Sequence, residues 1–206
     1  MDEDYASDAK ESDRYMGDLK NTRSINEFAD ELEINTSTLG CVMLDLNSIN
    51  IWSNDQMAAL LDPSELYVSE NPEHFWIKGD VTDDLHVTLL YGLLTPAYEQ
   101  GKNIDTVMRG WERPKLLRAG QIDLFPSPYD DENYMAVVAK VHDDALDDAH
   151  ARLSYLPHVD TNPKYKPHVT LFYVKANAAE YWKEVLNRFP FTFEVSQSWL
   201  NLGSAK

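Results

Sequence analysis

Compact apolar segments and stretches of helical periodicity alternate along most of this chain. Six segments have the length of strands and are rich in β-branched and aromatic residues or alternate between apolar and polar positions: residues 39–46, 85–93, 115–125, 133–141, 167–174 and 191–203. Four segments have helical spacing instead: residues 54–62, 96–111, 143–156 and 177–189. Some strands follow one another directly, whereas others are separated by helices. This order predicts an α+β domain or an α/β domain with a mixed sheet.

The beginning of the chain breaks this pattern. Its first 33 residues contain eleven Asp or Glu and four Lys or Arg, few apolar residues and no strand alternation. Residues 24–33 fit a short helix in which Ser24 is the N-cap and Glu27 completes a capping box. The residues before this helix have the composition of a mobile tail. We therefore expect an acidic flexible leader over residues 1–35 and one catalytic domain over residues 36–206.

Two of the predicted strands nearly repeat each other. The sequences "LHVTLLYG" and "PHVTLFYV" both contain His-Val-Thr-Leu, and their histidines lie 82 residues apart. Because alternate side chains of a strand face the same side, His86 shares a face with Thr88, and His168 shares one with Thr170. A buried polar pair on an apolar strand costs free energy unless it has partners. Its occurrence twice predicts one site to which each strand contributes a half.

The residue types in this repeat suit the cleavage of a phosphodiester. Histidine titrates near pH 6.5, so one neutral imidazole can take a proton from the attacking hydroxyl while a protonated one gives a proton to the leaving oxygen. Threonine hydroxyls can donate to the non-bridging phosphate oxygens. Two histidines and two threonines are a poor zinc site, so we expect neither a metal nor another cofactor. The sequence does not decide which histidine is the base and which is the acid.

In these two motifs the chain resembles the 2H phosphoesterase superfamily, over about residues 39–203. The resemblance implies a bilobal α+β fold, in which two antiparallel or mixed sheet lobes with flanking helices surround a central cleft. It implies a phosphodiesterase with His86 and His168 as the catalytic pair and with Thr88 and Thr170 as phosphate ligands.

Within that superfamily, "LGCVMLDL" followed by "HVTLLYGL" is similar to bacteriophage members. Phage members of the anti-CBASS class degrade cyclic di- and trinucleotides that their hosts use as immune signals. The resemblance therefore implies a cyclic oligonucleotide as the first candidate substrate. The alternative is RNA-end processing, on a 2′,3′-cyclic phosphate or a 2′-5′ linkage.

The net charge of −17 bears on the substrate. Proteins bind long nucleic acids largely by neutralising phosphates with Lys and Arg, so long DNA or structured RNA is a poor partner. A small nucleotide needs only a local pocket. Lys78 and Lys166 precede the two motifs and are candidates for contacting its phosphate, and Trp76, Tyr165 and Trp199 are candidates for stacking on its base.

The remaining composition bears on location and on alternatives to catalysis. No apolar run approaches the roughly 18–20 residues of a membrane span, and no apolar signal segment follows Met1, so we expect no membrane partner. The single cysteine, Cys41, fits a reducing cytoplasm, which is the host cytoplasm if the protein is phage-encoded. The non-enzymatic alternative is a sponge that holds a nucleotide without cleaving it. Both motifs are intact, and this favours an enzyme.

Overall fold

The computed structural model describes residues 39–48, 59–74, 77–82, 84–95, 99–159 and 164–204. Three features expected from the sequence lie outside these residues: the acidic leader with its helix, most of the helix expected over residues 54–62, and Trp76.

The described strands lie close to their expected positions. They are β1 (Gly40–Ser48), β2 (His86–Leu93), β3 (Leu116–Pro126), β4 (Tyr134–Val141), β5 (His168–Lys175) and β6 (Thr192–Ser204). The described helices are the 3-10 helix η2 (Pro72–His74) and the α-helices α4 (Gly101–Val107), α5 (Asp144–Leu153) and α6 (Ala179–Leu186). Helix α4 ends earlier than the periodicity predicts, and Gly110 then turns the chain at a φ of 74°.

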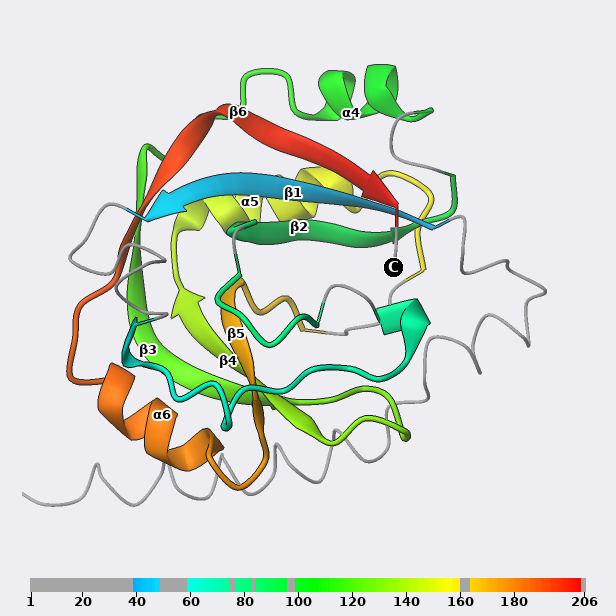
Figure 1. Ribbon diagram of the computed structural model, residues 1–206. Helices are drawn as coiled ribbons and strands as arrows, with labels where there is room; N and C mark the ends of the chain where they lie inside the picture. The colour runs from blue at the N-terminus through cyan, green and yellow to red at the C-terminus, as the bar shows by residue number, and fades with distance from the viewer. Residues whose placement is uncertain are drawn as a thin grey trace, which may run out of the picture. The chain divides into compact units, whose positions relative to one another are not determined.

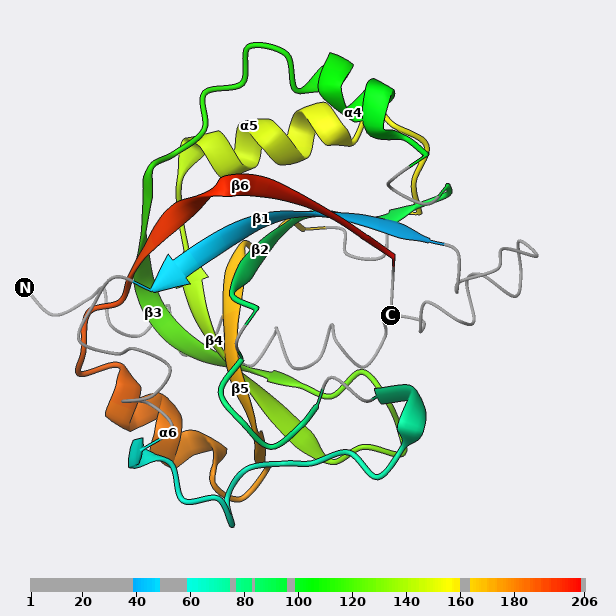
Figure 2. The ribbon, with the colours of Figure 1, turned by 45° about the horizontal axis from the view of Figure 1, so that its top comes forward.

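The six described strands pair in a closed ring, in the order β1-β2-β5-β4-β3-β6, and every pair is antiparallel. The α+β class is therefore confirmed, and the mixed sheet that the sequence left open is not found among these strands. The pairing is continuous instead of being divided between two separate sheets. The pairing of β2 with β5 is the shortest in the ring, since a single register pair joins these strands. The two strands diverge on either side of this pair in Figures 1 and 2.

Helices cover the outer face of the strand ring. The main hydrophobic core lies between these helices and the strands. Helix α5 packs on β2 and buries its apolar stripe of Leu146, Ala149 and Leu153, and α6 packs on β3 and β4. Figure 2 shows α5 and α6 on opposite sides of the ring. The N-terminus of α5 begins as a capped helix should, because Asp143 accepts a hydrogen bond from the backbone N–H of Ala145 at 2.9 Å.

A second, smaller core lies on the other face of β4. Tyr134, Ala136 and Val138 are buried there together with Ile77. Ile77 belongs to the connection over residues 66–82 that leads to β2. Both ends of this connection pair with β5, because the N–H of Tyr67 donates to the carbonyl of Tyr173, and that of Thr82 to the carbonyl of Leu171. This connection therefore covers part of the face that also carries the two motifs.

Candidate functional site

The two His-x-Thr motifs meet at the register pair that joins β2 and β5. Val87 lies opposite Val169 in an antiparallel ladder, and both valines are fully buried on the helix-covered face. Directly opposite residues of a sheet share a face, so the flanking residues lie together on the other face. The same register places His86 beside Thr170, and Thr88 beside His168. The structure thus brings together the four residues that the repeat singled out.

The order of buried and half-buried residues is the same in β2 and β5 from the histidine onward, as their sequences are nearly the same. From the histidine onward, both strands alternate half-buried and buried residues through the threonine and then place two buried residues in succession. The two successive buried residues result from a β-bulge in each strand. The register of β2 with β1 shifts at Leu89, and that of β5 with β4 shifts at Leu171. A bulge turns the following side chain to the opposite face. Tyr91 and Tyr173 consequently lie on the motif face.

Backbone carbonyls orient both imidazoles in the same way. The Nδ1 atom of His86 lies 2.8 Å from the carbonyl oxygen of Asp84, and that of His168 lies 2.8 Å from the carbonyl oxygen of Lys166. Because a carbonyl oxygen only accepts, Nδ1 carries the proton in each neutral ring. This assignment leaves a lone pair on each Nε2, which accepts a proton when the ring is neutral and donates one when it is protonated.

The cross-strand neighbours of the two histidines carry opposite charges. Asp45 of β1 is the register partner of His86, and Lys140 of β4 is the register partner of His168. Lys140 also forms an ion pair of 2.5 Å with Asp123. Directly opposite side chains have Cβ atoms about 4.5–5.5 Å apart, so Asp45 and Lys140 are near neighbours of the two imidazoles. The two histidines therefore have unequal electrostatic surroundings.

The environment of His168 opposes its protonation. Burial lowers the pKa of His168, and the neighbouring charges of His86 and Lys166 lower it further, against the opposing effect of the hydrogen bond to the Lys166 carbonyl. Phe125 of β3 contributes to the burial, because its ring meets the imidazole edge-on with a centroid distance of 4.7 Å. His168 is consequently neutral at neutral pH.

A pair of side chains holds β2 at its bulge. His150 of α5 lies with Nδ1 2.8 Å from the carbonyl oxygen of Leu89, and the hydroxyl of Tyr165 donates to the carbonyl oxygen of Thr88 at 3.1 Å. The two rings stack with a centroid distance of 4.1 Å. His150 is thus half-buried. His150 occupies one face of the Tyr165 ring, and the stacking of a base on this ring stays a prediction.

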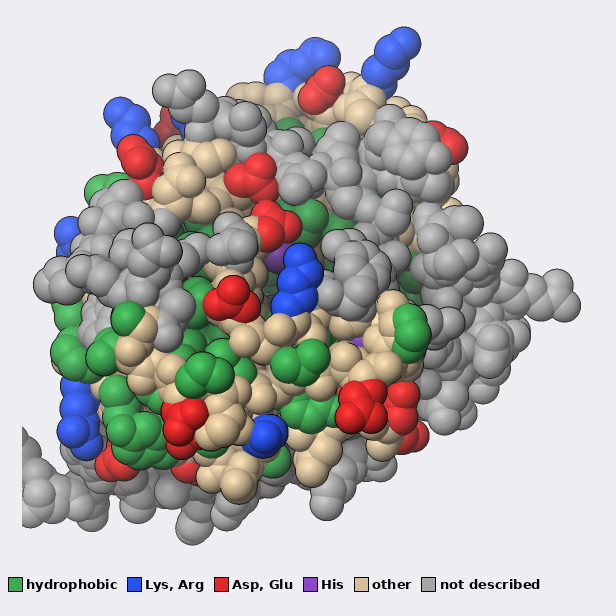
Figure 3. Space-filling view, in the orientation of Figure 1, with side chains coloured by type: hydrophobic (Ala, Val, Ile, Leu, Met, Phe, Trp, Pro, Cys, Tyr) green, Lys and Arg blue, Asp and Glu red, His purple; other side chains and the backbone are tan. Residues whose placement is uncertain are grey.

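The other candidates for substrate binding are placed less completely. Lys166 is half-buried immediately before the second motif, where burial lowers its pKa. Lys78 is exposed beside Val68 in the connection that covers the second core. Trp76 and the side chain of Trp199 lie outside the described residues. In Figure 3, imidazole surface is visible in a hollow near the middle of the face, among a basic side chain and carboxylates.

Sequence reasoning missed a buried carboxylate in the second core. Glu132 accepts hydrogen bonds from the hydroxyls of Ser69 and Tyr67, and His74 Nδ1 lies 2.7 Å from its Oε1. The hydrogen bonds from Ser69 and Tyr67, followed by that from His74, lower the pKa of Glu132 against the effect of burial. These contacts fasten the connection of residues 66–82 to the loop before β4. The sequence carries no local signal for them, because the partners are about 60 residues apart.

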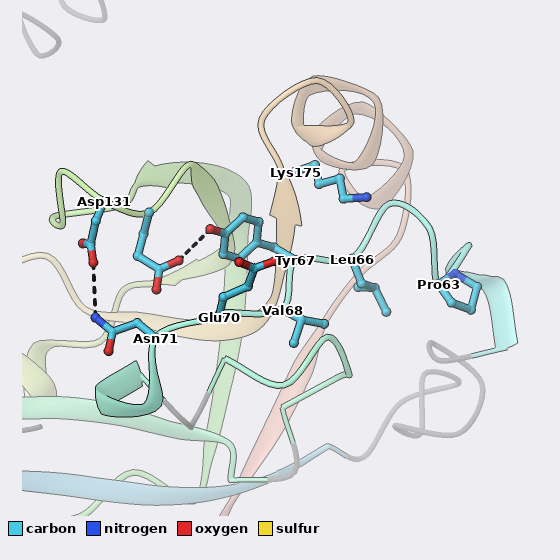
Figure 4. Close-up of a pocket in the computed structure, with 9 residues that line it drawn as sticks. Pro63, Leu66, Tyr67, Val68, Glu70, Asn71, Asp131 and Lys175 are labelled. Carbon is cyan, nitrogen blue, oxygen red and sulfur yellow. Dashed lines mark hydrogen bonds between the residues drawn. The ribbon is translucent and has the colours of Figure 1, made fainter.

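A pocket of about 530 Å³ opens beside this carboxylate and contains no motif residue. It is lined by residues of the segment 63–71, by Asp131 and Glu132, and by Lys175 at the end of β5. In Figure 4, Asn71 and Asp131 face each other across a hydrogen bond on one side, and Lys175 lies on another. The pocket is distinct from the His-x-Thr site, since Lys175 and His168 are at opposite ends of β5.

Among the residues that the structure describes, no cluster of three or more His, Cys, Asp or Glu is arranged to hold a metal ion. None of the described helices combines the length and the apolar character required to cross a membrane.

The sequence matches no protein-family model, and it matches no curated protein. Two solved structures of Usb1 from Kluyveromyces marxianus, one of them with uridine monophosphate, are similar to this chain. Each has a TM-score of 0.44 and 12% sequence identity, and the match covers 82% of this chain and 99% of the other.

Proposed function

We propose that the protein is a phosphodiesterase that cleaves a small nucleotide phosphodiester by acid–base catalysis between two histidines, without a metal ion. The observation that carries this proposal is the antiparallel pairing of the two His-x-Thr motifs about Val87 and Val169. It sets the two imidazoles diagonally on one face, each beside the threonine of the other motif. A phosphoryl group held by both hydroxyls then has an imidazole on each side.

The unequal surroundings of the histidines favour one division of roles. His168 acts as the base, because its lowered pKa keeps Nε2 unprotonated at neutral pH. His86, on the other side of the phosphoryl group, is then the acid that gives its proton to the leaving oxygen. Thr88 and Thr170 donate hydrogen bonds to the non-bridging oxygens, on which negative charge accumulates.

The same groups serve two versions of the reaction. In a 3′-5′ linkage, the neighbouring 2′-hydroxyl gives its proton to His168 and forms a bond to phosphorus, while the bond to the 5′-oxygen breaks and that oxygen takes a proton from His86. The products are a 2′,3′-cyclic phosphate and a free 5′-hydroxyl. In a substrate that is already a 2′,3′-cyclic phosphate, water is the nucleophile and one ribose oxygen leaves. The two classes expected from the sequence, cyclic oligonucleotide signals and RNA ends, are therefore compatible with one site.

The test is cleavage in EDTA of a panel that contains cyclic di- and trinucleotides, 2′-5′ oligoadenylate and RNA with a 2′,3′-cyclic end. His86→Ala and His168→Ala are expected to lose about 10²–10⁴-fold in rate. The matched control is His142→Ala, which removes an exposed histidine from outside the site and leaves the rate unchanged. The substrate cleaved decides between the two classes. Recovery of every ligand intact from wild-type protein overturns the proposal and leaves the nucleotide sponge.

A further inference from the structure

Three half-buried tyrosines surround the face that lies beyond the two motifs. Tyr91 and Tyr173 each follow the threonine of a motif by three residues, which is roughly 10 Å along a strand. The paired bulges turn both tyrosines onto the motif face. Tyr129, from the loop between β3 and β4, lies close enough to Tyr91 and to Tyr173 to raise the pKa of each hydroxyl. The three side chains come from separate elements and converge on one region.

Their hydroxyls are free to bind a ligand. Within the described part of the chain, none of these three hydroxyls makes a hydrogen bond to another side chain or to the backbone. Two of the rings are nevertheless held by ring contacts, since Tyr129 stacks on His74 with a centroid distance of 4.0 Å, and Tyr173 packs edge-on against Tyr134 at 5.1 Å. Tyrosine hydroxyls that are half-buried beside a binding site usually find a partner, and a ligand can supply it.

The surrounding charge decides the chemistry of that ligand. Burial raises the pKa of Tyr91 to about 12 and also raises that of Tyr173, so both hydroxyls are neutral donors at neutral pH. Burial raises the pKa of Tyr129 as well, and the carboxylates of Asp131 and Glu132 add to this effect. A second phosphate here would meet negative charge. A nucleobase or ribose, with its neutral acceptor oxygens and its apolar faces, fits this region better.

We infer that Tyr91, Tyr129 and Tyr173 form a subsite that binds the nucleoside next to the scissile phosphate, so that the preferred substrate extends beyond the phosphoryl group by at least one nucleoside. This inference rests on the proposed function for the position of the phosphate. The bulges at Leu89 and Leu171 are then functional features, because without them both tyrosines would point into the main core.

The test compares two substrates and one ligand that cannot react. A dinucleoside monophosphate reaches both the phosphate site and the subsite, whereas 2-hydroxypropyl 4-nitrophenyl phosphate carries an attacking hydroxyl but no nucleoside. The variants Tyr91→Phe, Tyr129→Phe and Tyr173→Phe remove only the hydroxyls and keep the rings. Each is expected to raise KM for the dinucleotide about threefold to tenfold, the loss of one neutral hydrogen bond, and to leave kcat/KM for the nitrophenyl ester unchanged. Tyr155→Phe, at a tyrosine that is 86% exposed, is the matched control.

Calorimetric titration with a 2′-deoxy dinucleoside monophosphate, which lacks the attacking hydroxyl, reads the subsite independently of turnover. Its Kd is expected to rise by the same factors in the three variants. Unchanged KM and Kd overturn the inference, and so does an equal loss on both substrates, which indicates a structural effect. If no phosphodiester is cleaved but the Kd changes as expected, the proposed function fails and the subsite stands.

Discussion

Val87 of β2 faces Val169 of β5 at the register pair that connects the two halves of the strand ring. Because the ladder is antiparallel, a local twofold rotation about this pair exchanges the two motifs and sets the histidines diagonally. In an in-line displacement at phosphorus, the attacking and leaving oxygens lie on opposite sides. In the proposed reaction, each of the two imidazoles related by this rotation acts on one of these oxygens.

The division of roles predicts that a good leaving group rescues only one histidine variant. 4-Nitrophenolate leaves without a proton, so its ester needs the base and not the acid. His86→Ala should therefore retain most of the wild-type rate with 2-hydroxypropyl 4-nitrophenyl phosphate, which carries the attacking hydroxyl, and lose about 10²–10⁴-fold with a dinucleotide. His168→Ala should lose activity with both substrates. The reverse pattern, measured by steady-state kinetics, would assign the base to His86.

Phe125 is expected to control the acid limb of the pH–rate profile. The pKa of His168 is lowered chiefly by burial, and activity requires its neutral form, so this limb lies below the ordinary pKa of histidine, which is about 6.5. Phe125→Ala admits water to the imidazole and should move the limb to higher pH. Lys166→Met removes a positive charge that lowers the pKa of His168 less than burial does, so it should move the acid limb to higher pH by a smaller amount. A limb that does not move in Phe125→Ala contradicts the role given to burial.

The sequence was sufficient to predict that the histidine and the threonine of each motif share one face of their strand, because alternation within one strand is a local property. The repeat also contained the bulges, in the apolar pairs that follow each His-x-Thr, but an apolar pair reads equally well as the end of a strand. Asp45 and Lys140 were not predicted as neighbours of the histidines. Their proximity depends on which strands pair and in which register, and strands far apart in the sequence give no local sign of that.

The contribution of the two threonine hydroxyls to activity can be measured separately from the contribution of the side-chain shape. Thr88→Val and Thr170→Val keep the branched side chain that suits a strand and remove one donor to the phosphate oxygens. Each is expected to reduce kcat by about 10²-fold, as for the loss of one donor to a developing oxyanion. Ser in place of either threonine should retain most of the activity. Equal activity of the Val and Ser variants in the same assay would remove the threonines from the site.

Glu132 offers a prediction about stability that is independent of catalysis. Its carboxylate is buried and accepts from Ser69, Tyr67 and His74, so Glu132→Gln should lower the free energy of unfolding by about 2–4 kcal/mol at pH 7. The lowered pKa of Glu132 gives the sign of the pH dependence. Its contribution is fully present above the ordinary carboxyl pKa of about 4.3 and is lost as the pH falls through the lower value in the folded protein. Urea unfolding should therefore show a large difference between wild type and variant at pH 7 that shrinks toward pH 3.

The exposed Glu184 of α6 gives the matched control, because Glu184→Gln removes the same charge without breaking a buried contact. It should change the stability by less than about 0.5 kcal/mol at either pH. If Glu132→Gln behaves like this control, the carboxylate does not fasten the connection over the motif face. If it is destabilising but its effect is the same at both pH values, the loss comes from packing instead of charge. Only a loss that depends on pH in the stated direction supports the three hydrogen bonds to the ionised carboxylate as the cause.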